Sequence, residues 1–142
     1  MNDRAVSTAV TWALTMLITT LLITGLLVAT GNQIRDRTES VTRSELEVIG
    51  QQLVSDLSAA DRLAQSEADT VTVQSRLPDR VAHGTYRVEI SATVDGTSVR
   101  IASGNTAVTV PMANRTAVQN ASLPGGDLHI SLDGGILEVS DA

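Results

Sequence analysis

The sequence has no cysteine, no phenylalanine and no lysine, and its 142 residues include one Trp, one Tyr and three Pro. Without cysteine, disulfide bonds, thiolate zinc sites, thiol nucleophiles and lipidated cysteines are excluded. Because aromatic rings are nearly absent, a core has to be built from Val, Ile, Leu and Ala, which bury less area per side chain. The composition therefore predicts a small folded domain of modest stability, without covalent cross-links.

Basic residues are fewer than acidic ones: ten Arg stand against ten Asp and six Glu, for a net charge of −6. An acidic surface repels nucleic acid and anionic lipid, so neither is an expected partner. The absence of Lys, the excess of Asp over Glu and the abundance of Thr, Val and Ala look like the proteome of a salt-loving archaeon, where salt screens the repulsion between carboxylates. This composition suggests a habitat and not a function.

One long uncharged run occupies the N-terminal part of the chain. No charged side chain lies between Arg4 and Arg35, and residues 6–30 are mostly Leu, Ile, Val, Ala and Thr. About 20 apolar residues cross a hydrocarbon layer about 30 Å thick, so the run predicts a transmembrane helix at residues 6–30. The alternative is a secretory signal removed after the small residues of Ala29-Thr30-Gly31, although the run exceeds the roughly 7–15 apolar residues of such signals.

Threonines give this predicted helix a weakly polar stripe. At about 100° per residue, one arc of the helix holds Thr8, Thr11, Thr15, Thr19 and Thr30. We expect their hydroxyls to return hydrogen bonds to carbonyl groups of the same helix. Small and hydroxyl-bearing residues also let two membrane helices approach closely, so the stripe predicts helix packing. The alternative is that Thr is common in this composition and is merely tolerated.

The segment Asp3-Arg4-Ala5-Val6-Ser7 stands directly before the apolar run. It resembles the class III signal of archaeal type IV pilin-like proteins. In that family a short basic leader, ending in Arg or Lys followed by Gly or Ala, is cut by a prepilin peptidase on the cytoplasmic side. The resemblance implies a leader of residues 1–5, cleavage between Ala5 and Val6, and a hydrophobic helix retained in the mature protein.

Two positions depart from this family's patterns. Thr8 stands where the common haloarchaeal form, Arg-Ala-Val-Ser-Pro, has its proline, and Val10 stands where bacterial pilins carry a buried glutamate used in assembly. The chain also looks like an uncharacterised haloarchaeal family of small pilin-like membrane proteins, over residues 44–53, residues 58–63, Leu77-Pro78 and Gly84-Thr85-Tyr86. No established activity comes with that similarity.

The resemblance also implies an orientation and a set of partners. A leader cut in the cytoplasm places the protein in the cell membrane as a single-pass protein with its C-terminal domain extracellular. The positive-inside rule alone favours the opposite orientation, because Arg35, Arg37 and Arg43 follow the run. The implied partners are the membrane, a prepilin peptidase and other pilin-like subunits.

Residues 31–68 show helical periodicity. Apolar residues recur at Ile34, Val41, Leu46, Ile49, Leu53, Leu57, Ala60 and Ala64, with charges between them. This spacing predicts an amphipathic helical stalk that continues the transmembrane helix, since no proline precedes Pro78. Gly31-Asn32 and Gly50 are the expected kink sites. The apolar stripe has to be covered, either by the protein's own β-rich domain or by neighbouring helices.

From Thr70 the apolar period changes to two. Residues 86–94 alternate cleanly, and Asp95-Gly96 before the next alternating run predicts a hairpin. Further strands are expected at residues 107–110, 128–132 and 136–139, with Asp133-Gly134-Gly135 as a turn and residues 123–126 as a loop. The sequence thus predicts an α+β fold: a long N-terminal helix packed on a small antiparallel β-sheet, with a β-rich extracellular domain at residues 69–142.

Motifs that carry chemistry are scarce. His83 and His129 have no neighbouring Cys or Glu-rich cluster to complete a metal site. No nucleophile elbow, phosphate-binding loop or dinucleotide fingerprint occurs, so we expect no enzyme activity, no cofactor and no small-molecule substrate. Cation binding would need acidic residues to meet in the fold, and isolated carboxylates are expected on an acidic surface anyway: the candidates are Asp56, Asp61, Asp69, Asp95 and Asp133.

Two sequences in a polar loop satisfy the N-glycosylation acceptor pattern, Asn114-Arg115-Thr116 and Asn120-Ala121-Ser122. A pattern this short also arises by chance. Taken together, these features favour a pilin-like structural or accessory subunit of a cell-surface filament or envelope assembly. The alternative is a solitary signal-anchored surface protein that binds a partner through its β-rich domain.

Overall fold

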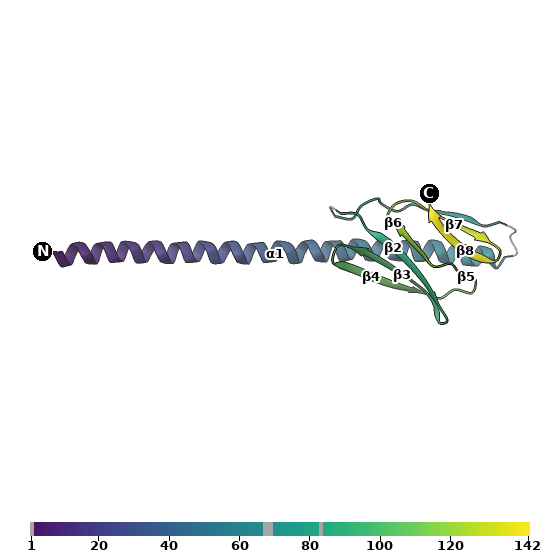
Figure 1. Ribbon diagram of the computed structural model, residues 1–142, viewed down its shortest axis with the longest axis horizontal. Coiled ribbons are helices and arrows are strands. Elements are labelled where there is room, and N and C mark those ends of the chain that lie inside the picture. The colour runs from purple at the N-terminus through teal and green to yellow at the C-terminus, as the bar shows by residue number, and fades with distance from the viewer. Residues whose placement is uncertain (1, 67–69, 83) are drawn as a thin grey trace. The chain divides into compact units, whose positions relative to one another are not determined.

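The computed structural model describes residues 2–66, 70–82 and 84–142, except for the side chains of residues 2–5, 32, 33 and 35. Two compact units divide the chain: Met1–Thr38, which we call the N-terminal unit, and Glu39–Ala142, which we call the head unit. Helix α1 (Asn2–Ala64) begins in the first unit and ends in the second (Figure 1). No break occurs in α1 at Gly31 or Gly50.

The head unit continues with eight strands among its described residues. They are β1 (Thr72–Ser75), β2 (Arg87–Thr93), β3 (Gly96–Ser103), β4 (Thr106–Met112), β5 (Ala117–Val118), β6 (Ala121–Pro124), β7 (Leu128–Asp133) and β8 (Ile136–Asp141). One sheet has the order β4-β3-β2-β6 and the other β1-β7-β8-β5. All pairings are antiparallel except β5 with β8. The α+β class is confirmed, but the strands form two sheets, not the single sheet that was expected.

The last part of α1 supplies one wall of the head core. Its buried residues follow a helical spacing of three and four: Leu46, Ile49, Leu53, Leu57 and Ala60. The sheets contribute buried aliphatic residues from alternate positions, among them Val88, Ile90, Val99 and Ile101 of one sheet and Leu128, Ile130, Leu137 and Val139 of the other. Of the two ways to cover the apolar stripe, the protein's own sheets therefore do so for this part of α1.

Gly50 explains how closely the helix approaches the sheet. A β-carbon at this position would lie 2.8 Å from Cγ2 of Val110 and 3.4 Å from Cδ1 of Ile101. Because a real side chain cannot be accommodated at 2.8 Å without a shift, glycine lets α1 pack directly on β3 and β4. Gly50, expected as a kink site, is a packing site.

Two hydrophobic patterns extend past the core of the head unit. Ile34 and Val41 belong to the predicted stripe, and their side chains are 60% and 53% exposed, because the part of the stripe that the sheets bury begins only at Leu46. Cover by neighbouring helices stays a prediction for these two residues. The β2–β3 hairpin is confirmed, but its turn is formed by Val94 and Asp95 and lies beyond the core. Val94 is therefore fully exposed, although it continues the alternating run.

The remaining differences concern short strands. Residues 123–126 were expected as a loop, but Leu123 and Pro124 end β6, which pairs with β2 at the edge of its sheet. The turn at Asp133-Gly134-Gly135 is confirmed, with both glycines at positive φ.

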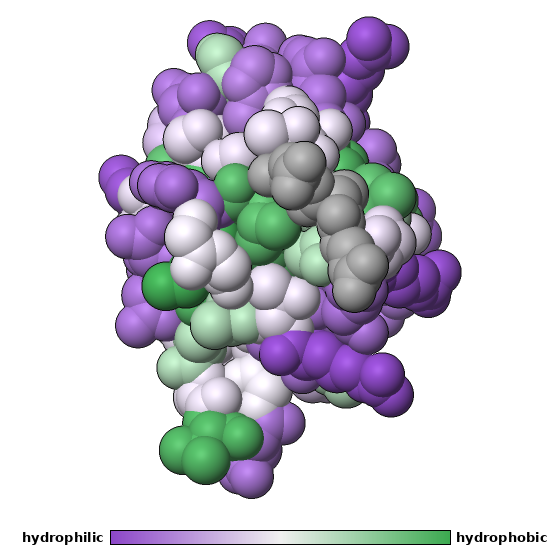
Figure 2. Space-filling view, turned by 90° about the vertical axis from the view of Figure 1, so that its right-hand side faces the viewer, coloured by the Kyte–Doolittle hydropathy of each residue, from purple (hydrophilic) through white to green (hydrophobic). Residues whose placement is uncertain are grey.

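Figure 2 shows one face of the head unit: most of its surface is hydrophilic, and hydrophobic residues form separate small areas.

Candidate functional site

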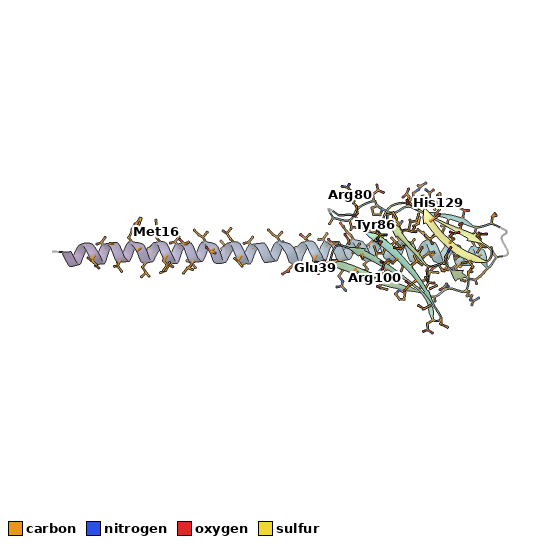
Figure 3. All side chains as sticks on the ribbon, viewed as in Figure 1. Met16, Glu39, Arg80, Tyr86, Arg100 and His129 are labelled. Atoms are coloured by element: carbon orange, nitrogen blue, oxygen red, sulfur yellow. The ribbon has the colours of Figure 1, made fainter. Side chains whose placement is uncertain are left out.

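The large apolar side chains of the N-terminal unit are exposed. From Val6 to Val28 the large apolar side chains are between 49% and 69% exposed. Figure 3 shows side chains projecting along this part of α1, including Met16. The helix is long and apolar enough to cross a membrane. Exposed apolar surface on this scale is costly in water and favourable in lipid.

The threonine stripe on this helix is satisfied internally. The hydroxyls of Thr11, Thr15 and Thr19 donate to the carbonyl oxygens of Ser7, Thr11 and Thr15, each at 2.8 Å. This confirms the expected return of hydrogen bonds to the helix, which removes most of the cost of placing a hydroxyl in hydrocarbon. Thr8 lies exposed on the same side. A hydroxyl oxygen that donates its proton in this way still has lone pairs with which it can accept a hydrogen bond from another helix.

A shallow groove runs beside part of this stripe. Its volume is about 320 Å³, and it is lined by Trp12, Thr15, Met16, Thr19 and Thr20. Its lining combines the two large side chains of Trp12 and Met16 with three threonines, and small residues beside large ones are a composition that helix–helix contacts in membranes use. Of the four predicted packing threonines, Thr15 and Thr19 line this groove. At the predicted leader site Val6 is exposed, and the side chain of Ala5 lies outside the described residues.

The two predicted glycosylation sequences are placed differently by the fold. Asn114 lies between β4 and β5 and is half-buried; its Nδ2 donates to the carbonyl oxygen of Thr116 at 2.7 Å. Asn120 lies between β5 and β6 and is exposed; its Oδ1 accepts a hydrogen bond from the backbone N–H of Ala92 at 2.7 Å. The same sequence pattern therefore gives one inward-facing and one outward-facing side chain.

Two of the five candidate carboxylates for a cation site, Asp56 and Asp61, connect parts of the fold. Asp56 accepts a hydrogen bond of 2.6 Å from the hydroxyl of Ser75, which joins α1 to β1. Asp69 and His83 lie outside the described residues, and His129 lies on β7 (Figure 3). Within the described residues, no group of three His, Asp or Glu side chains could hold a metal ion.

Asp61 anchors the connection between β4 and β5, a role that the sequence did not reveal. Its buried carboxylate accepts the backbone N–H of Thr116 at 2.7 Å and that of Arg115 at 3.2 Å, and Nε2 of Gln65 at 2.8 Å. Burial by itself raises the pKa of the Asp61 carboxyl, but the hydrogen bonds from Thr116 and Arg115, with the charge of Arg115, outweigh it and lower the pKa. Asp61 is thus a charged structural anchor.

Comparison with known proteins gives one result. A model of a family of unknown function, DUF7266, matches residues 1–139. No curated protein and no solved structure matches the chain.

Proposed function

The chain belongs to the DUF7266 family, and we propose that it is a non-enzymatic, pilin-like structural or accessory subunit of a cell-surface filament or envelope assembly. In this proposal residues 6–30 lie in the cell membrane and the head unit lies outside the cell. The orientation rests on the similarity of Asp3 to Ser7 to class III leaders.

The observation that carries this proposal is that the two parts of α1 have different roles. Its uncharged N-terminal part has exposed apolar side chains, while its C-terminal part, from Leu46 to Ala60, is a core element of the head unit. A passive membrane anchor does not need to continue as a core helix of the head unit, because a flexible linker between the anchor and the domain is sufficient. A helix that serves both membrane and core suits a subunit whose function depends on that helix.

Processing of the leader gives the first test. When the full chain is produced together with a cognate prepilin peptidase, we expect the mature protein to begin at Val6, and without the peptidase at Met1. The substitution Ala5→Asp should block the cut because it removes the small residue that such leaders carry, whereas Asp3→Asn should leave it unchanged. Intact mass spectrometry of the purified membrane protein measures the N-terminus. A chain that still begins at Met1 beside an active peptidase would contradict the processing step.

Helix packing gives the second test. Because the sequence has no cysteine, an introduced thiol can form a disulfide only with the same thiol of another copy. Thr15→Cys places a single thiol on the threonine stripe, and Leu17→Cys places one two residues on, about 200° around the helix. Under mild oxidation in native membranes we expect a disulfide-linked product from Thr15→Cys and little from Leu17→Cys. Non-reducing gel electrophoresis measures the yield. Equal yields from both variants would remove the threonine stripe as the packing surface.

The alternative function is a solitary anchored protein that binds a partner through its β-rich domain. Val94 favours it, since a fully exposed apolar side chain at the β2–β3 turn leaves surface for a partner. In that case neither cysteine variant should give a specific product.

A further inference from the structure

The two Asn-X-Ser/Thr sequences differ in the exposure of the asparagine side chain and in the hydrogen bonds that its amide makes. At Asn114 the fold takes up the reactive amide: Nδ2 donates to the carbonyl oxygen of Thr116, and the backbone N–H of Thr116 donates in turn to the carboxylate of Asp61. The Oδ1 atom of Asn114 is buried as well, without a hydrogen-bond partner among the described residues. An enzyme could reach this amide only by pulling the loop away from Asp61.

Asn120 offers its amide to solvent. The side chain is exposed, and its Nδ2 has no hydrogen-bond acceptor in the described parts of the chain. Its Oδ1 accepts a hydrogen bond from the backbone N–H of Ala92, which engages the oxygen of the amide and leaves the nitrogen for reaction. The hydroxyl of Ser122, two residues on, is exposed and has only a long contact of 3.5 Å with Nη1 of Arg87.

An open hollow of about 390 Å³ lies beside this amide. It is lined by residues of β2 and of the second sequence, namely Glu89, Ile90, Ser91, Asn120, Ala121 and Ser122. Hydroxyl, carboxylate and amide groups on its walls are suitable hydrogen-bond partners for a sugar. The first sugar of a glycan can therefore lie against the protein without displacing any core residue.

From these differences we propose that Asn120 is an N-glycosylation site and that Asn114 is not. The donor is a lipid-linked oligosaccharide, attached through a phosphate, and a membrane-bound transferase brings it to the head unit. A bond forms between Nδ2 of Asn120 and C1 of the first sugar, the bond from C1 to the phosphate oxygen breaks, the lipid phosphate leaves with the electron pair, and Nδ2 loses one proton. The hydrogen bond from Ala92 to Oδ1 survives this reaction, because only the nitrogen is modified.

This inference rests on the proposed outward position of the head unit, and the sequence allows the two sites to be separated. Trypsin cuts after Arg100 and Arg115, and no Lys or Arg follows Arg115, so Asn114 lies in the peptide 101–115 and Asn120 in the peptide 116–142. We would purify the full chain from cells that glycosylate their exported proteins and map both peptides by mass spectrometry. A resident glycoprotein of the same membranes shows that transfer is active.

The expected result is a sugar mass on peptide 116–142 alone. The substitution Asn120→Asp keeps an oxygen for the N–H of Ala92 and should abolish the added mass, and Ser122→Ala should abolish it without touching the amide. The matched substitution Asn114→Asp should leave the added mass in place. Sugar on peptide 101–115, or added mass that persists in both Asn120→Asp and Ser122→Ala, would overturn the assignment.

Protease added outside intact cells separates this inference from the proposed function. If the protease digests the head unit and Asn120 carries no sugar, the glycosylation site is wrong while the outward orientation stands. If the head unit is protected and unmodified, both are wrong.

Discussion

Replacing Leu53 with Ala is expected to lower the free energy of unfolding of the head unit by about 2–5 kcal/mol. Leu53 is fully buried on α1, within the core lined by both sheets. Its loss removes apolar contacts and leaves a cavity that the surrounding strands fill only in part, because protein interiors are close-packed. For a head unit with almost no aromatic side chains in its core, such a loss is a large part of the total stability.

The measurement uses the full chain in detergent, unfolded with denaturant. The only Trp, Trp12, lies in the N-terminal unit, whereas the only Tyr, Tyr86, is buried in the head unit, so the tyrosine signal in the near ultraviolet reports on the head. Val48→Ala is the matched control: Val48 lies on the same helix but is 64% exposed, and its change should stay within about 0.5 kcal/mol. If both substitutions have equal effects, α1 is not the core element described above.

The features predicted best from the sequence are those that depend on neighbouring residues. The apolar run has a signature in composition alone, and the spacing of Leu46, Ile49 and Leu53 marks a helix face directly. The β2–β3 hairpin was found because a turn and two alternating runs lie next to each other in the chain. In each case the residues that make the structure are close in sequence.

The features that were missed depend on distant residues. Strand β5 has two residues and lies parallel to β8, so neither length nor a local turn marks it. β6 carries Pro124 and is followed by two glycines, a composition typical of loops, yet pairing with β2 makes it a strand. The exposure of Val94 has the same origin: a period of two shows which residues share a face but not how far the core extends beneath it.

The candidate sites also depend on residues that are distant in sequence. The sequence pattern treats Asn114 and Asn120 alike, and only the fold separates them, through Asp61 on one side and Ala92 on the other. Asp61 was considered only as a cation ligand, because its partners Arg115 and Thr116 lie more than 50 residues away in the chain. The threonine hydroxyls, in contrast, bond four residues back along one helix, so their arrangement could be predicted.

Asp61 also gives a prediction that depends on pH. The substitution Asp61→Asn should lower the free energy of unfolding by about 1–3 kcal/mol at neutral pH, because an amide replaces a buried carboxylate that accepts two backbone N–H groups, those of Arg115 and Thr116. The pKa of the Asp61 carboxyl lies below its ordinary value of 3.8 in the folded protein. A lowered pKa means that folding favours the charged form, so its contribution is complete above the unfolded pKa and is lost as the pH falls through the folded pKa.

The difference in unfolding free energy between the unmodified chain and Asp61→Asn should therefore be constant from neutral pH down to about pH 5 and should shrink below about pH 4. Denaturant unfolding of both chains across this range measures it. Asp95→Asn, at the exposed β2–β3 turn, is the control and should show a negligible difference throughout. A difference that persists unchanged in acid would mean that the two acceptor oxygens of the Asp61 carboxyl group, and not its charge, hold the loop between β4 and β5. In that case the loop that withdraws Asn114 from solvent would not be released by acid.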